Sequence, residues 1–130
     1  MTFLARQPAG RLTGAREISK SEKIPMQFLW KILQTLTRRR LIRSFKGIRG
    51  GYELAQPADK ITVSMVLSAN NDADRFRRCL LGLPRCSDEE PCPLHHRWKE
   101  LRAGLTEMLE NSTLADLAGA AERNGKDTKK

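Results

Sequence analysis

The stretch "IPMQFLWKILQTLTRRRLIRSFKGIRGGYELA", residues 24–55, decides the fold of this chain. Over residues 26–39 the apolar side chains recur at helical period, and the opposite face is polar and basic. The apolar stripe consists of Phe28, Leu29, Ile32, Leu33 and Leu36. Pro25 suits the first position of this helix. The preceding "GAREISKSEKI", residues 14–24, predicts a short helix with Thr13 as its N-cap, so the two helices have the pattern of a helix-turn-helix.

The second half of the stretch predicts a β-hairpin. "LIRSF" (residues 41–45) and "GYELA" (residues 51–55) alternate apolar and polar residues, and the three glycines of "KGIRGG" (residues 46–51) can adopt positive φ. A basic hairpin directly after a helix-turn-helix is typical of a winged helix. We therefore predict a mainly α fold with a small β-hairpin, in which a winged helix-turn-helix is joined to a C-terminal dimerisation helix.

The net positive charge of the chain comes entirely from its first half. Residues 1–60 contain 13 Lys and Arg against 4 Asp and Glu, whereas residues 61–130 contain 11 of each. A solvated surface is the ordinary interpretation of basic residues, but this concentration favours a module that binds a polyanion. Lys and Arg that neutralise phosphates release counterions, and this release drives binding to double-stranded DNA.

Two groups of residues are candidates for contacts with DNA. The outer face of the 26–39 helix, near its start, should meet base edges through Gln27, Trp30, Lys31 and Gln34. The end of that helix and the hairpin should meet phosphates or the minor groove through Arg38, Arg39, Arg43, Lys46 and Arg49.

The second half of the chain predicts a dimerisation helix. The segment "PLHHRWKELRAGLTEMLE", residues 93–110, has apolar residues spaced 4-3-4-3, which is a seam of about two heptads. The seam that we expect at a homodimer interface consists of Leu94, Trp98, Leu101, Leu105 and Met108. Thr62 should cap a helix before this segment, and Ser112 or Thr113 should cap one after it. The expected parts are the winged helix (1–69), a Cys-rich loop (70–93), the dimerisation and C-terminal helices (94–121) and a disordered tail (122–130).

All three cysteines and both histidines lie in "RCLLGLPRCSDEEPCPLHH", residues 78–96. Thiolates and imidazole together are ligands for zinc, copper(I) or iron–sulfur clusters. Cys92 and His95 are three residues apart at the start of the predicted helix, so both can face the same way. The start of a helix also favours the thiolate form of Cys92. Cys79, Cys86, Cys92 and His95 are therefore candidate metal ligands.

Other interpretations of this stretch remain open. Zinc sites usually use closer cysteine pairs, which weakly favours a cluster. Cysteines can also pack as small hydrophobic residues without a metal. Asp88, Glu89 and Glu90 could supply an oxygen ligand, although a solvated acidic loop is the simpler interpretation, and we expect His96 to be a surface residue.

Composition limits the class of protein. No apolar run approaches the roughly 20 residues of a membrane span, and "MTFLARQP" lacks the features of a signal peptide. An odd number of cysteines is a poor match to a secreted disulfide framework. We therefore expect a soluble cytoplasmic protein with reduced thiols and no membrane partner. No nucleophile, base and orienting group assemble in the sequence, so we do not expect an enzyme.

The chain resembles the Rrf-two family of bacterial winged-helix regulators, which has iron–sulfur members of the IscR and NsrR types. The matching stretches are "AREIS", "IPMQFLWKILQTLTRRRLI", "SFKGIRGGYELAQPADKIT", "CSDEEPCPLHHRW" and "STLADL". The resemblance implies a dimeric DNA-binding regulator whose subunits each hold an iron–sulfur cluster through three cysteines and a fourth ligand. His95 matches the fourth ligand of the IscR-like members.

Three features depart from the family pattern. Family members usually carry a longer first helix than "MTFLARQPAG" supplies, and NsrR-like members take an acidic cluster ligand from it. The gap of six residues between Cys79 and Cys86 leaves the cluster type open. Trp30 stands where a polar, groove-facing residue is expected, so the family's operator sequence is not transferable.

These observations predict a transcriptional regulator whose operator affinity is switched by an iron–sulfur cluster. A [2Fe–2S] cluster is preferred to a [4Fe–4S] cluster, since mixed nitrogen and sulfur ligation is well attested for two-iron clusters. The first alternative is a cluster-free winged-helix regulator that responds through cysteine oxidation or zinc. The second is an electron-transfer protein, which would have no need of the basic first half.

Overall fold

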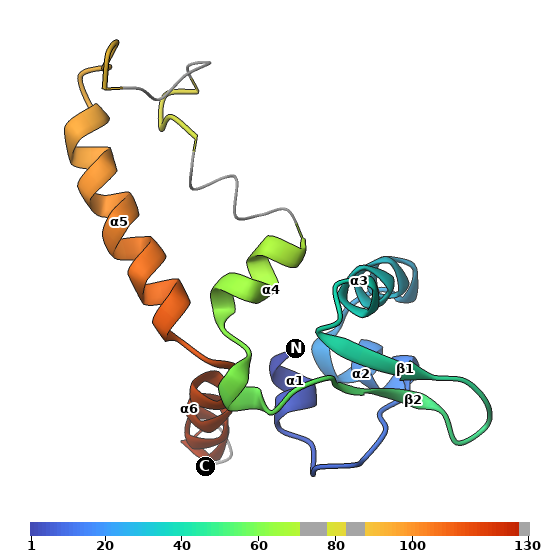
Figure 1. Ribbon diagram of the computed structural model, residues 1–130. Helices are drawn as coiled ribbons and strands as arrows, with labels where there is room; N and C mark the ends of the chain where they lie inside the picture. Colours follow the sequence, from blue (N-terminus) through green and yellow to red (C-terminus); the bar gives the residue numbers. More distant parts are fainter. Residues whose placement is uncertain (71–77, 83–87, 128–130) are drawn as a thin grey trace.

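The computed structural model describes residues 1–70, 78–82 and 88–127, with residues 126 and 127 described by backbone alone. A winged body formed by the first half of the chain carries a long helix that projects away from it (Figure 1). The elements in chain order are α1 (Thr2–Ala5), α2 (Ala15–Glu22), α3 (Met26–Arg38), β1 (Ile42–Phe45), β2 (Gly51–Leu54), the 3-10 helix η1 (Ala58–Lys60), α4 (Val63–Ala69), α5 (His95–Asn111) and α6 (Leu114–Asp127). The predicted fold class, a winged helix with a C-terminal helical part, is confirmed.

The turn between α2 and α3 is fixed by a left-handed residue and a side-chain cap. Lys23 ends α2 with φ of 55°. The Ser19 hydroxyl donates to the Ile24 carbonyl at 2.6 Å, and the Ile24 amide donates to the Ser19 carbonyl. The N-cap of α2 is Gly14, so the prediction of Thr13 was wrong. Thr13 instead forms a two-bond bridge with Tyr52 that joins the N-terminal segment to the hairpin.

Helix α3 buries a narrower stripe than the sequence pattern predicts. Leu29, Leu33 and Leu36 are buried, at the i, i+4 and i+7 spacing of one helix face. Phe28 is 64% exposed and Ile32 is 38% exposed, so only part of the predicted apolar stripe is buried. The winged body of one chain therefore leaves part of the apolar surface of α3 in contact with solvent. Pro25 is the N-cap of α3, one position before the one predicted.

The hairpin has the predicted position and a tight connection. Strands β1 and β2 pair antiparallel, with Ile42 opposite Leu54 and Phe45 opposite Gly51. A Cβ on Gly50 would lie 2.1 Å from the Phe45 carbonyl oxygen, so only glycine fits there. Ile42 is buried at the base of the hairpin, which anchors it to the core.

The core continues into the C-terminal half through paired segments. Ile61 and Leu114 are fully or almost fully buried, and the Leu114 amide donates to the Ile61 carbonyl. Thr62 and Thr113 form an isolated antiparallel bridge. The start of α4 and the end of α5 therefore lie close to where α6 begins. Helix α6 then packs against α1 and η1.

Two predicted caps are confirmed, and one boundary is wrong. The Thr62 hydroxyl accepts from the Met65 amide at 3.2 Å. Thr113 caps α6, since its hydroxyl accepts from the Asp116 amide, also at 3.2 Å. The predicted disordered tail, 122–130, was wrong over its first six residues because α6 continues to Asp127. Within the described part of the chain, no helix is both long and apolar enough to span a membrane.

Candidate functional site

The outer face of α3 is open to solvent. The side chains of Gln27, Trp30, Lys31, Gln34 and Arg38 are not buried, and none takes part in the apolar stripe. The end of α3 and the hairpin enclose a groove of about 440 Å³ lined by Gln34, Thr37, Arg38, Ser44 and Tyr52. The helix and the hairpin thus form one continuous concave surface.

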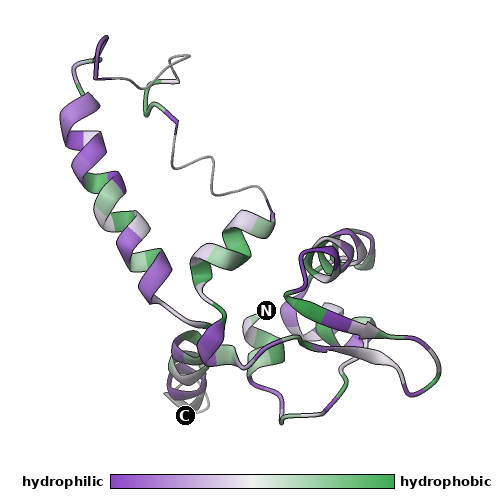
Figure 2. Ribbon diagram, viewed as in Figure 1, coloured by the Kyte–Doolittle hydropathy of each residue, from purple (hydrophilic) through white to green (hydrophobic). Residues whose placement is uncertain are grey.

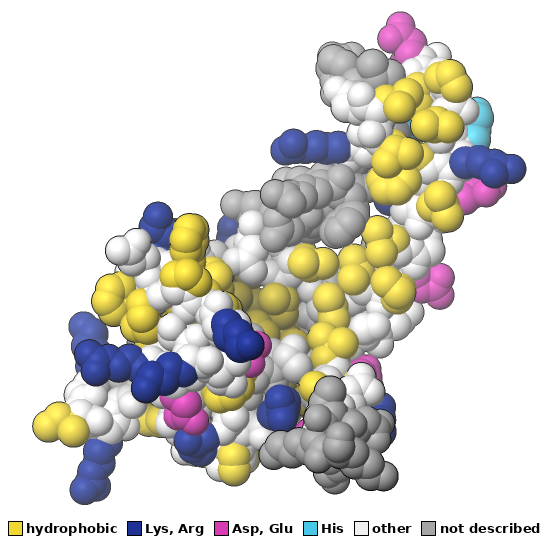
Figure 3. Space-filling model, turned by 180° about the vertical axis from the view of Figure 1, so that it is seen from behind, with side chains coloured by type: hydrophobic (Ala, Val, Ile, Leu, Met, Phe, Trp, Pro, Cys, Tyr) yellow, Lys and Arg dark blue, Asp and Glu magenta, His cyan; other side chains and the backbone are white. Residues whose placement is uncertain are grey.

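The basic residues of the hairpin lie in two different places. Lys46 and Arg49 are exposed at its tip beside the fully exposed Ile48. Arg43 lies lower on β1, where its Nε is 3.6 Å from Glu53 Oε1 on the neighbouring strand. Lys and Arg side chains gather over the hairpin side of the molecule (Figure 3). Arg39 is also exposed, just after the last residue of α3.

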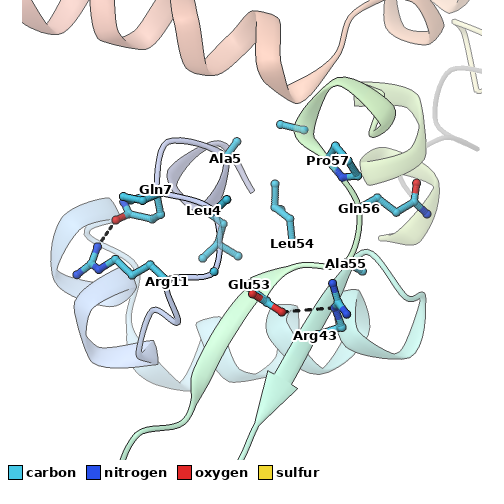
Figure 4. A pocket seen from close by; sticks show the side chains of 14 residues that line it. Leu4, Ala5, Gln7, Arg11, Arg43, Glu53, Leu54, Ala55, Gln56 and Pro57 are labelled. Atoms are coloured by element: carbon cyan, nitrogen blue, oxygen red, sulfur yellow. Dashed lines mark hydrogen bonds and ion pairs between the residues drawn. The ribbon is translucent and has the colours of Figure 1, made fainter.

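A second cavity, of about 410 Å³, lies between the N-terminal segment and the hairpin (Figure 4). Leu4 and Leu54 contribute apolar surface to it, and the Arg43–Glu53 ion pair lies at its wall. Arg43 therefore faces this cavity, whereas its neighbour Ser44 faces the groove beside α3. The alternation of side chains along a strand explains this difference. Sequence reasoning grouped Arg43 with the tip residues because charge runs carry no information on strand faces.

Two of the predicted metal ligands lie side by side. Cys79 Sγ is 4.0 Å from Cys92 Sγ, and Cys79 is buried. This distance is about twice the length of an S–S bond, so no disulfide joins them. Two thiolates on one tetrahedral metal, with metal–sulfur distances of about 2.3 Å, lie about 3.8 Å apart. The pair therefore fits a shared metal ion, while the predicted ligand Cys86 lies outside the described residues. Among described residues no group of three or more potential ligands is assembled.

His95, the fourth predicted ligand, begins α5 and is only 3% exposed. Its Nε2 is 2.8 Å from Asp88 Oδ1. Lys99 Nζ is 3.1 Å from the other carboxylate oxygen of Asp88. The hydrogen bond from His95, followed by those from Lys99, holds the pKa of the Asp88 carboxyl below its ordinary value. His96 is exposed, as predicted.

Sequence reasoning missed the Asp88–His95 contact. It crosses the turn at Pro91 and Pro93, and no helical or strand spacing relates residues seven apart in such a turn. The acidic run therefore had the pattern of a solvated loop.

The first turn of α5 is fastened to the segment that contains Cys79. Trp98 Nε1 donates to the Arg78 carbonyl at 2.9 Å. This bond and the Cys79–Cys92 contact both join residues 78–82 to the beginning of α5. Trp98, predicted at a dimer seam, thus also has a role within its own chain.

The rest of the predicted seam runs along α5 as an apolar stripe. Leu101 is 67% exposed and Met108 is 55% exposed, while Leu105 is half-buried. Leu94 is the exposed N-cap residue, just before the first helical turn. Apolar and polar residues alternate along α5, whereas α4 beside it is mainly apolar (Figure 2). Within the described part of one chain, Leu94, Leu101 and Met108 of this stripe remain exposed.

The helix-turn-helix and the hairpin, with exposed basic residues around the groove between them, are those of a winged-helix protein. The family model described as "Rrf2: Iron-dependent Transcriptional regulator" matches residues 1–120. The chain therefore belongs to the Rrf2 family of transcriptional regulators, and the predicted family is confirmed.

Relatives in sequence agree with this assignment. A predicted HTH-type transcriptional regulator of Aquifex aeolicus is 37% identical over 116 residues, which cover 88% of this chain and 81% of the relative. The HTH-type transcriptional regulator IscR of Pectobacterium atrosepticum is 31% identical over 120 residues, covering 88% and 73%. The relatives are regulators of transcription and not enzymes, as predicted.

Solved structures share the fold. CymR, the global cysteine regulator of B. subtilis, superposes with a TM-score of 0.74 at 24% identity and covers 92% of this chain and 87% of its own. IscR of T. potens gives a TM-score of 0.73 at 20% identity, with 95% and 80% coverage.

Proposed function

We propose that this Rrf2-family regulator is a homodimer that binds operator DNA and whose operator affinity is switched by an iron–sulfur cluster. The observation that carries the cluster proposal is the approach of Cys79 Sγ to Cys92 Sγ, 4.0 Å apart beside the buried His95. The relatives named IscR support the same class of regulator.

The proposed DNA interface is the outer face of α3 with the hairpin tip. Gln27, Trp30, Lys31 and Gln34 are accessible near the start of α3, where a recognition helix contacts base edges in the major groove. Arg38, Arg39, Lys46 and Arg49 lie at projecting points on either side of the groove and are suited to phosphates. Arg43 is a weaker candidate than in the sequence analysis because Glu53 already neutralises part of its charge.

The proposed dimer interface is the apolar stripe of α5. A monomer would expose Leu94, Leu101 and Met108 to water, and contiguous apolar surface of this kind marks an interaction site. Pairing of α5 with its symmetry mate would cover this stripe and set the spacing of two α3 helices, one for each half of the operator.

The proposed cluster ligands are Cys79, Cys86, Cys92 and His95. Cys79 and Cys92 have a separation that suits a shared tetrahedral iron, and His95 lies three residues beyond Cys92, at the start of α5. When bound, the cluster supplies a link sensitive to redox state, iron or nitric oxide. We keep the preference for [2Fe–2S] over [4Fe–4S], since an imidazole ligand suits the former.

The chain's own residues would transmit the change. Cys79 and Arg78 belong to the segment after the winged body, and Cys92 and Trp98 belong to the start of α5. Separation of these pairs would free residues 78–82 from α5. Helix α5 packs on α4, and α4 packs on α3, so the orientation of the recognition helices depends on how α5 is held.

Anaerobic purification tests this proposal. We expect iron and acid-labile sulfide to be present in the protein, with visible absorption that Cys86→Ala removes. Operator affinity should differ between cluster-bound and cluster-free protein, while binding to unrelated duplexes should not. Protein that binds the operator but holds no iron or sulfide after reconstitution would contradict the cluster and leave thiol oxidation of the Cys79–Cys92 pair as the switch.

A further inference from the structure

Asp88 makes a short polar contact with one of the proposed ligands. Its Oδ1 is 2.8 Å from His95 Nε2, and both of its oxygens lie within 3.2 Å of Lys99 Nζ. His95 is buried, whereas Asp88 is 65% exposed. The carboxylate therefore approaches the imidazole from the solvent side and is itself held by a cation one helical turn further along α5.

This contact determines the protonation pattern of the imidazole. A carboxylate only accepts hydrogen bonds, so Nε2 must carry the proton that is donated to Asp88. In the neutral ring the lone pair is then on Nδ1. Ligand histidines in proteins commonly donate their second N–H to a carboxylate in this way, which fixes both the tautomer and the ring orientation.

We infer that Asp88 is a positioning residue that holds His95 in the tautomer protonated at Nε2, so that Nδ1 is the nitrogen whose lone pair can bind a metal. This inference rests on the proposed cluster site. It differs from the interpretation of Asp88 as an oxygen ligand, because the carboxylate acts through His95 and not on the metal. Lys99 holds the carboxylate in place through its contacts with both oxygens.

The tautomer of His95 gives a test that needs no cluster. In reduced, metal-free protein at about pH 8, long-range ¹H–¹⁵N correlation spectra should show His95 protonated at Nε2. Asp88→Ala should convert this to a mixture of tautomers. Asp88→Asn, which keeps an oxygen acceptor at the same place, should retain most of the Nε2–H form. Glu89→Ala is the matched control, since Glu89 is an exposed acid next to Asp88, and should change nothing.

Cobalt(II) binding to the same reduced proteins gives the second readout. Loss of such a hydrogen-bond partner typically lowers metal affinity about 10- to 100-fold, so Asp88→Ala should bind cobalt(II) more weakly than Glu89→Ala by about that factor. Tighter binding by Asp88→Ala would mean that the carboxylate competes with the metal for Nε2, and would overturn the inference. An unchanged tautomer in Asp88→Ala would overturn it as well, even with weaker binding, since that pair of results describes an oxygen ligand. Failure of the protein to take up a cluster would refute the proposed function, whereas the tautomer spectra would still decide whether Asp88 orients His95.

Discussion

Gly50 shows how a single residue shapes the wing. The space for a Cβ at this position is occupied by the Phe45 carbonyl, whose oxygen would lie 2.1 Å away, and by the Lys46 carbonyl carbon. Backbone atoms within a tight hairpin cannot move aside independently, so any side chain must open the turn. We therefore expect Gly50→Ala to lower the free energy of unfolding by about 1–3 kcal/mol, the usual cost of forcing an extra carbon into filled space. Urea unfolding measures this, with Gly104→Ala inside α5 as the control, because nothing lies within 4 Å of a Cβ there. Equal losses in both variants would contradict the clash.

The contribution of Asp116 to the stability of the fold is expected to depend on pH in the acid range. The Thr113 amide and hydroxyl donate to its carboxylate, which lowers its pKa below the ordinary 3.8. A lowered folded-state pKa stabilises the fold above the ordinary value, and this contribution is lost as pH falls through the folded-state pKa. Asp116→Asn should therefore lower the free energy of unfolding at neutral pH. The difference in this free energy between variant and wild type should narrow below pH 3.8. A difference that stays constant from neutral pH to below pH 3.8 in urea unfolding would count against this.

The hairpin should contribute to DNA binding through the charged residues at its tip and not through those along its strand. Replacing both Lys46 and Arg49 with Ala should weaken binding to all duplexes about equally and reduce the slope of log K against log salt by about 2, if both contact phosphate. Arg43→Ala is the matched control, since Arg43 pairs with Glu53 and faces the N-terminal segment. Fluorescence anisotropy at several salt concentrations measures both. A larger change in slope for Arg43→Ala than for the tip pair would reverse the assignment.

For the whole molecule, we predict that dimerisation depends on helix α5. Leu101→Glu should give monomers and abolish tight operator binding, since each half-site alone binds weakly. Leu101 is mostly exposed in one chain, so the change should not unfold the monomer. Thr106→Glu, an exposed position outside the seam on the same helix, is the control. Light scattering reports the mass of each variant, and circular dichroism reports its helix content. A dimer that survives Leu101→Glu would place the interface elsewhere.

The sequence predicted what depends on near neighbours along the chain. Helix α3 and the hairpin follow from local periodicity and from glycines in the turn, so their boundaries agree with the structure within a residue or two. The exposure of Phe28 and Ile32 was not predictable, because periodicity marks an apolar face without saying whether another element covers it. The cavity-facing position of Arg43 and the Asp88–His95 contact depend on strand face and on turn geometry, which composition does not encode.

The bridge between Thr62 and Thr113 attaches the C-terminal end of helix α5 to the winged body. Helix α5 has 17 residues, so its first turn lies about 25 Å from the end next to the bridge. His95 and Cys92 lie at the end of α5 that is remote from the bridge, and the winged body lies at the other end. Over an arm of that length, a shift of about 2 Å at the tip corresponds to a rotation of only about 5° at the base. A displacement of the cysteines therefore corresponds to only a small rotation of α5 against the winged body.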